Sequence, residues 1–116
     1  MNKLSNKVQL IGNLGAKPEV LTFDGGRKKV NARMATSEVY KDATGKKVTE
    51  TQWHNIVAWG NTAEVFERYL DKGSKIAVEG RLVHRSYDDK EGNRKYISEV
   101  VVNELLMMDT KNRDSE

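Results

Sequence analysis

The sequence predicts an all-β domain of five strands with one helix between the third and fourth strands. Five segments alternate apolar and polar side chains with the period of two that is typical of half-buried strands. One segment alone has the helical period, and turn-forming Gly, Asp and Asn residues separate several of the others. An open antiparallel sheet of this size leaves unpaired edges, so we expect it to curl into a small closed barrel.

The expected strands cover residues 7–15, 29–39, 48–59, 75–85 and 96–108, and residues 19–23 are a candidate for a further short strand. Alternation is clearest in residues 29–39, where Val30, Ala32 and Met34 share one face. Glycines at positions 12, 60 and 80 lie within or at the ends of strands, where bends and bulges help a small sheet to wrap.

The helix is expected over residues 62–72. Asn61 can act as its N-cap, and Glu64, three residues on, completes an arrangement close to a capping box. Gly73 stands where a left-handed C-terminal cap is expected. The apolar stripe is formed by Ala63, Phe66 and Leu70 and is extended by Val65 and Tyr69. Three strands, a helix and two strands in a closed barrel make up the oligonucleotide/oligosaccharide-binding (OB) arrangement.

Length and composition narrow the functional class. At 116 residues we expect one domain over residues 1–108 and a short, polar, disordered end over residues 109–116. The absence of cysteine excludes disulfides, thiolate nucleophiles and cysteine-based zinc sites. No nucleophile–base pair and no supported carboxylate pair is found, so we expect neither an enzyme nor a cofactor or metal site. The sequence shows no signal peptide and no membrane-spanning run, which favours the cytoplasm.

The two tryptophans of the chain, Trp53 and Trp59, lie six residues apart in one strand-like run. Six is an even number, so both indoles project from the same face of an extended segment. Tyr40 and Tyr87 end two other strand-like runs, each beside charged residues. Flat rings beside charge suit stacking on the bases of an unpaired nucleic acid. Burial of both tryptophans in the core is the alternative, and alternation alone does not decide it; Phe23 and Tyr96 are interpreted as structural.

Eight short motifs follow one another in a fixed order between residues 6 and 108. They are NKVQLIGNLG (6–15), KPEV (17–20), ATSE (35–38), TQWHNIV (51–57), AEV (63–65), YLDKG (69–73), VEGRL (78–82) and EVVV (99–102). Each is weak alone, but together and in this order they resemble the bacterial single-stranded DNA-binding proteins, over nearly the whole chain.

This resemblance implies an OB fold and a protein, usually a homotetramer, that holds unpaired DNA during DNA replication, recombination and repair, near the nucleoid. It assigns base stacking to Tyr40, Trp53, Trp59 and Tyr87. The best-known members are similar but carry Trp, Phe and Trp where this chain has Tyr40, Trp59 and Tyr87, and each exchange keeps a π-face. Members typically continue into a flexible linker with an acidic tip. This chain ends in the mixed-charge residues 109–116, so tail-mediated recruitment of replication and repair enzymes is not expected.

Basic residues cluster at the connections, in residues 27–29, 41–47 and 90–95. The formal net charge is only +3, so the placement of the cations matters more than their sum. A solvated loop is the common fate of such runs, and a cationic rim that follows phosphates is the functional interpretation. Arg33 and Arg85 are preferred because a strand fixes their position. The expected phosphate contacts are Lys7, Arg33, Lys41, Lys72, Arg85 and Arg94.

Two alternatives remain open. The first is a dimeric primosomal-type variant of the same family, or one borne on a plasmid or phage, with a reduced, tail-less role. The second is an OB-type module that binds a protein or a saccharide, with the aromatic side chains as an apolar docking patch. The second alternative predicts that oligo-dT does not quench the fluorescence of Trp53 and Trp59 and that binding has no salt dependence.

Overall fold

The computed structural model describes residues 3–108, so the predicted polar end at residues 109–116 lies outside the described residues. The elements, in chain order, are β1 (Val8–Leu14), β2 (Glu19–Thr22), β3 (Lys28–Lys41), β4 (Lys47–Trp59), α1 (Gly60–Tyr69), β5 (Lys75–Asp88) and β6 (Arg94–Met107). Single turns of 3-10 helix, η1 and η2, occupy Lys3–Asn6 and Asp24–Gly26.

The strands form one sheet in the order β1-β5-β6-β4-β3-β2, and a further pairing of β1 with β3 closes it. The closure joins Asn13 to Ala35 and Leu14 to Met34. β4 and β6 run parallel where residues 55–57 face residues 99–101, and the other pairings are antiparallel. Five strands therefore complete the barrel, and the short β2 extends it beside β3. The predicted OB fold, with its helix between the third and fourth barrel strands (β4 and β5), is confirmed.

The interior of the barrel is apolar. Val30, Ala32 and Met34 are buried on one face of β3, where alternation placed them together. They belong to one cluster with the buried side chains of the other strands, which include Leu14, Ile56, Ile76, Val78 and Val100. At the bulge between Glu79 and Gly80 the two neighbouring backbones approach so closely that a side chain on Gly80 would collide with the Val101 carbonyl. This close approach helps β5 to curve around the core.

Helix α1 adds Ala63 and Phe66 to the core, and Leu70, directly after the helix, joins them, as the apolar stripe predicted. The predicted bounds of the helix were wrong. It begins at Gly60, whose φ is 60°, and the preceding residue offers no capping side chain, so the capping box expected at Asn61 does not form. Tyr69 is 63% exposed rather than buried. Gly73 has the left-handed φ expected of a cap, at 88°, but it lies beyond the helix, and its N–H donates to the Leu14 carbonyl.

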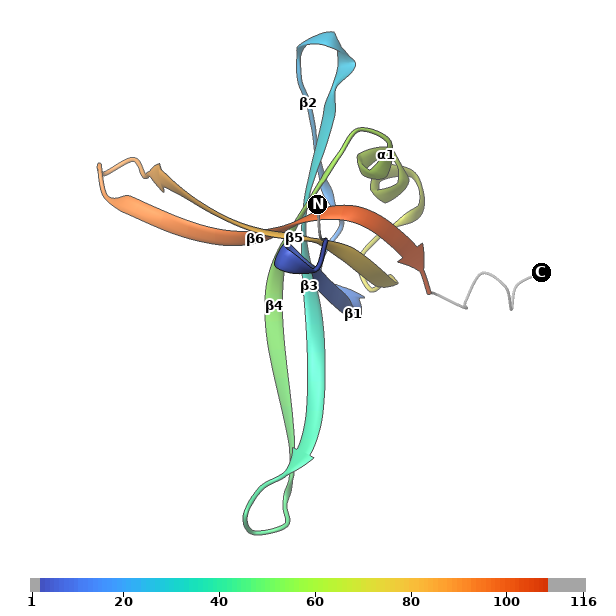
Figure 1. Ribbon diagram of the computed structural model, residues 1–116, viewed down its shortest axis with the longest axis vertical. Helices are drawn as coiled ribbons and strands as arrows, with labels where there is room; N and C mark the ends of the chain where they lie inside the picture. The colour runs from blue at the N-terminus through green and yellow to red at the C-terminus, as the bar shows by residue number, and fades with distance from the viewer. Residues whose placement is uncertain (1–2, 109–116) are drawn as a thin grey trace, which may run out of the picture.

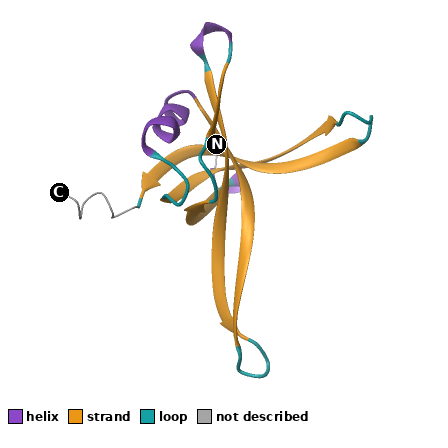
Figure 2. Ribbon diagram, turned by 180° about the vertical axis from the view of Figure 1, so that it is seen from behind, coloured by secondary structure: helices purple, strands orange, loops and turns teal. Residues whose placement is uncertain are grey.

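Three hairpins project from the barrel in different directions (Figures 1 and 2). We call residues 36–52 the β3–β4 arm, residues 84–98 the β5–β6 arm and residues 19–31 the β2–β3 hairpin. β3 continues to Lys41 and β5 to Asp88, beyond the predicted strand ends, so Tyr40 and Tyr87 lie inside the arms. Within residues 3–108, no helix has the length and apolar character needed to cross a membrane.

Candidate nucleic-acid interface

Trp53 and Trp59 lie on the same outer face of β4, as their spacing predicted. Register places Trp53 opposite Ala35 and Trp59 opposite Lys29, while the alternate residues Ile56 and Ala58 are buried. We call this surface the Trp face. It continues across the parallel pairing of β4 with β6, where Glu99 lies beside Asn55. From β6 it continues onto β5, where Arg85 and Tyr87 lie on the same face of the sheet as Glu99. One continuous surface therefore spans four strands.

Trp53 is half exposed, with 51% of its surface accessible, and it is held in place. The six-membered ring lies against the backbone of Gly15, where a methyl group would come within 2.7 Å of Cη2. The guanidinium carbon of Arg33 lies 5.1 Å from the ring centroid, in range of a cation–π contact. Gly15 also donates its N–H to the Arg33 carbonyl at 2.9 Å. Ring, arginine and glycine therefore form one fixed unit that leaves part of the indole open.

Trp59 has more neighbours than Trp53 and is only partly exposed. Phe23 stacks on it with a centroid distance of 5.9 Å and an interplanar angle of 28°. The guanidinium carbon of Arg27 lies 4.4 Å from the ring centroid, and Nζ of Lys29 lies 5.4 Å from it. The interpretation of Phe23 as a purely structural residue missed this surface cluster, in which Phe23 itself is 46% exposed.

Arg85 lies near the base of the β5–β6 arm, and Tyr87 lies near its tip, one residue before the end of β5. Tyr87 is 47% exposed. Nε of Arg85 donates to Oε1 of Glu99 at 2.8 Å, and this hydrogen bond raises the pKa of Arg85 above its usual value. The Glu99 side chain is buried, whereas that of Arg85 is 46% exposed. The guanidinium is thus permanently charged and well positioned, but a carboxylate offsets its charge.

A groove on the Trp face brings the two predicted strand arginines together. It has a volume of about 330 Å³, and its lining includes Lys17, Arg33, Asn55, Arg85 and Glu99. Arg33 reaches it from β3 beside Trp53, and Arg85 reaches it from β5 two residues before Tyr87. The groove therefore brings two guanidinium groups together, one beside Trp53 and one two residues before Tyr87, and its lining also includes the carboxylates of Glu19 and Glu99.

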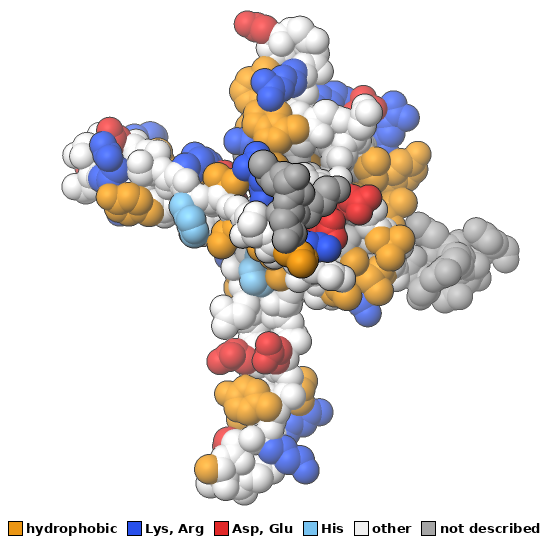
Figure 3. All heavy atoms as spheres, viewed as in Figure 1, with side chains coloured by type: hydrophobic (Ala, Val, Ile, Leu, Met, Phe, Trp, Pro, Cys, Tyr) orange, Lys and Arg blue, Asp and Glu red, His pale blue; other side chains and the backbone are white. Residues whose placement is uncertain are grey.

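Tyr40 is 47% exposed on the β3–β4 arm, opposite Val48. In the register of β3 and β4, Tyr40 and Trp53 point to opposite faces of the sheet. Tyr40 therefore lies on the other side of the ribbon from the Trp face. Glu38 and Glu50 lie directly opposite each other between Tyr40 and the barrel. They form the acidic patch across this arm in Figure 3. The structure therefore groups Trp53, Trp59 and Tyr87 on one surface and leaves Tyr40 apart from them.

The six predicted cations differ in their partners. Lys7 pairs with Glu79 at 3.1 Å, and Arg94 pairs with Asp88 at 3.2 Å. Arg85 has Glu99, and Arg33 lies over Trp53. Among residues 3–108, no carboxylate forms an ion pair with Lys41 or Lys72. Arg33, Lys41 and Lys72 therefore keep their full charge for a ligand.

The turns at the tips of both arms are built alike. Oδ1 of Asp42 accepts hydrogen bonds from the N–H groups of Thr44 and Lys46, both at 2.9 Å. The hydroxyl of Thr44 also donates to it at 2.7 Å. This side-chain hydrogen bond is the main reason why the pKa of Asp42 lies below its ordinary value. In the same way, Oδ1 of Asp89 accepts hydrogen bonds from the N–H groups of Glu91 and Asn93, at 2.9 and 2.8 Å.

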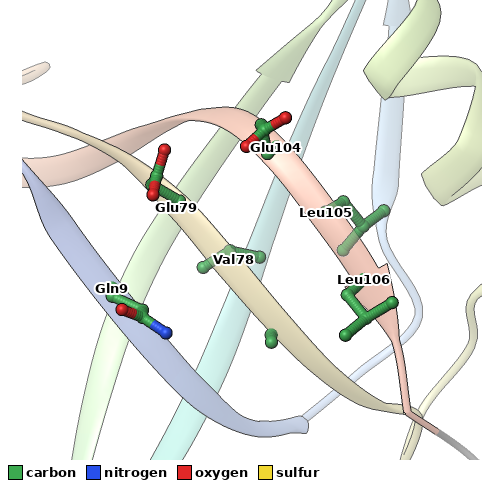
Figure 4. A pocket seen from close by; sticks show the side chains of 7 residues that line it. Gln9, Val78, Glu79, Glu104, Leu105 and Leu106 are labelled. Atoms are coloured by element: carbon green, nitrogen blue, oxygen red, sulfur yellow. The ribbon is translucent and has the colours of Figure 1, made fainter.

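A second groove lies on the outer side of β1, β5 and β6, with a volume of about 320 Å³. Glu79 and Glu104 occupy neighbouring strands along it, together with Gln9, Leu105 and Leu106 (Figure 4). Its charged side chains are carboxylates, which makes it unsuitable for phosphates. Among residues 3–108, no group of three or more His, Asp or Glu side chains is arranged to hold a metal ion.

Comparison with known proteins agrees with this architecture. The sequence model described as the "Single-strand binding protein family" matches residues 5–108. A protein of Chlorobaculum tepidum named single-stranded DNA-binding protein 1 is 46% identical over 107 residues, which are 91% of this chain and 66% of that protein. A Xylella fastidiosa protein of the same name is 44% identical over 91% of this chain and 79% of its own length.

Solved structures give the same result. The structure described as the Plasmodium falciparum SSB in complex with ssDNA superposes with a TM-score of 0.84 at 32% identity, over 94% of this chain and all of that one. A deletion mutant of the Thermus aquaticus single-stranded DNA-binding protein gives 0.77 at 29% identity, over 92% of this chain and 52% of that one. Since the family match covers most of the chain and the curated relatives exceed 40% identity, the chain belongs to the single-strand binding protein family.

Proposed function

We propose that this protein binds single-stranded DNA with little sequence preference and without catalysis. The observation that carries the proposal is Trp53, a half-exposed indole that Gly15 and Arg33 hold on the Trp face. Every base has a π-face, so stacking on a fixed ring tolerates any sequence, and each stacked base contributes roughly 1–3 kcal/mol. The names of the relatives and the ssDNA-bound Plasmodium structure support this function.

In this proposal the stacking surfaces are Tyr40, Trp53, Trp59 and Tyr87. Among the cations, Arg33, Lys41 and Lys72 contact phosphates with uncompensated charge. The other three expected contacts, Lys7, Arg85 and Arg94, each have a carboxylate partner, so we expect a smaller net contribution from them. The groove between Arg33 and Arg85 carries the backbone from Trp53 towards Tyr87.

The proposed biological setting rests on what the family resemblance implies. We propose one binding domain over residues 1–108 that acts in the cytoplasm at the nucleoid, as a homotetramer, during DNA replication, recombination and repair. A tetramer would let one strand contact several barrels, and linked sites bind more tightly than single sites because of their effective concentration. Neither a cofactor nor an acidic tail has a role in this proposal.

The test is a titration of fluorescently labelled oligo-dT at two salt concentrations, with duplex DNA as competitor. We expect tight binding that weakens with salt, with a logarithmic slope of about −0.7 for each phosphate contacted. Duplex DNA should compete poorly, and light scattering should give the mass of four chains. Binding without salt dependence, or no binding, would contradict the proposal and favour a protein- or saccharide-binding module. The mass of two chains would favour the primosomal-type alternative.

A further inference from the structure

The β2–β3 hairpin lies over Trp59. Phe23 stacks on the indole, Arg27 lies 4.4 Å from its centroid, and Lys29 lies 5.4 Å from it. A ring with an aromatic neighbour and two cationic neighbours has less free π-surface than Trp53, whose ring contacts are one guanidinium and one glycine backbone. Phe23 is the more exposed ring of this cluster, with 46% of its surface accessible, whereas Trp59 is only partly exposed.

Backbone hydrogen bonds fix this cluster. The N–H of Phe23 donates to the Arg27 carbonyl at 2.7 Å, and the N–H of Gly26 returns to the Phe23 carbonyl at 3.0 Å. Phe23 and Arg27 therefore flank the same tight turn. Lys29, two residues further along, pairs across the sheet with Trp59 itself. The positions of Phe23 and Arg27 relative to the indole are thus set by a turn and a strand register rather than by flexible side chains alone.

The three basic residues 27–29 contact two different parts of the molecule. Lys28 reaches helix α1, where Nζ lies 2.7 Å from Oε1 of Glu67 and 3.7 Å from Oε1 of Glu64. Arg27 and Lys29 reach Trp59 instead, and no carboxylate among residues 3–108 pairs with either of them. One cation attaches the hairpin to the helix, while the two beside the rings stay uncompensated.

We propose that Phe23 is a further base-stacking side chain at this end of the Trp face. Trp59 lies against it and supports its ring, and Arg27 and Lys29 are the phosphate contacts of the same subsite. This inference rests on the proposed binding of single-stranded DNA and adds one ring to its four. A base stacked on Phe23 lies beside two unpaired cations, which is the combination of ring and charge that single strands require.

The test compares the affinities of Phe23→Ala, Phe23→Tyr and Tyr96→Ala for labelled oligo-dT. Tyr96 is a matched control because it is also an exposed aromatic side chain, at 79%, on the β5–β6 arm. We expect Phe23→Ala to lose affinity on the order of tenfold, which is one stacked base. Phe23→Tyr should stay within about twofold of the wild type because it keeps the ring, and Tyr96→Ala should bind normally. Melting temperatures check that each variant folds.

A second set of variants tests the contribution of Arg27 and Lys29, with Lys28 as the control. Arg27→Gln and Lys29→Gln should each flatten the salt dependence by about 0.7 in slope, whereas Lys28→Gln, which removes the same charge from the same run, should flatten it less. The inference is wrong if folded Phe23→Ala binds oligo-dT like the wild type while Trp53→Ala does not, a result that leaves the proposed function intact. If the wild type itself fails to bind oligo-dT, both proposals fail.

Discussion

The indole of Trp53 lies directly on the backbone of Gly15, and no side chain fits between them. Gly15 follows β1, whereas Trp53 lies in β4, so the contact joins two segments far apart in the sequence. The Gly15 N–H bonds to the carbonyl of Arg33, whose guanidinium lies over the same ring. The orientation of the most exposed tryptophan therefore depends on the absence of a single carbon atom at position 15.

Gly15→Ala should weaken binding of single-stranded DNA through Trp53 alone. The new methyl group displaces the ring, and we expect part of the roughly 1–3 kcal/mol of a stacked base to be lost. Trp53→Ala should lose the whole of that energy and stay folded, because the side chain is half exposed. A double-mutant cycle with labelled oligo-dT tests the coupling: in the Trp53→Ala background, Gly15→Ala should cost nothing further. Additive losses in the double mutant would show that Gly15 acts independently of the ring.

Glu99→Gln should leave the guanidinium of Arg85 without its counter-charge. The pair is 2.8 Å long and the carboxylate is buried, so the substitution should lower the free energy of unfolding by about 1 kcal/mol. The affinity for oligo-dT should nevertheless rise, and the salt slope should steepen by up to about 0.7, because the guanidinium no longer has an internal counter-charge. Salt-dependent binding curves of Glu99→Gln and Arg85→Gln provide the comparison. A loss of affinity as large as that of Arg85→Gln would mean that Glu99 serves only to orient the arginine.

The cross-strand pair Glu38–Glu50 should oppose binding. Two carboxylates face each other on the β3–β4 arm between Tyr40 and the barrel, on the same side of the ribbon as Tyr40, where a strand stacked on Tyr40 would bring phosphates. The double variant Glu38→Gln/Glu50→Gln should bind oligo-dT several-fold more tightly. It should also be more stable by roughly 0.2–1 kcal/mol, since like charges directly opposite in a sheet repel. The double variant Glu91→Gln/Glu104→Gln removes two exposed carboxylates outside this arm and is the control for total charge. Equal affinity in all three proteins would exclude a phosphate path along this part of the arm.

The tip of the β3–β4 arm should be resistant to acid. Its hydrogen bonds, chiefly that from the Thr44 hydroxyl, hold the pKa of Asp42 below the ordinary value of 3.8. A depressed folded-state pKa means that the stabilisation is present at neutral pH and is lost only as the pH falls below 3.8 through the lower folded value. The NMR shifts of the Thr44 and Lys46 amides, followed against pH, measure this. Thr44→Val should move the transition to higher pH, and an unchanged midpoint would assign the effect to the backbone donors.

The alternation of apolar and polar residues predicted the barrel strands and the shared face of the two tryptophans. Both depend on the two-residue period with which side chains alternate along a strand. The helix start was wrong because Gly60, with its positive φ, begins the helix before the capping residues that the sequence offers. The stack of Phe23 on Trp59 joins residues far apart in the chain and depends on how the β2–β3 hairpin curls back, which no local period encodes. The pairing of Arg85 with Glu99 likewise depends on the exact register of β5 and β6.

The aspartate turns at the two arm tips have a thermodynamic consequence. Each closes its loop with amide donors from the second and fourth residues after the aspartate, using atoms of this chain alone. The arms are therefore preorganised. Binding of DNA does not have to remove the conformational entropy of two flexible loops. Calorimetry should accordingly find a heat-capacity change that matches the apolar area covered by the nucleotides, without the additional decrease in heat capacity that accompanies coupled folding.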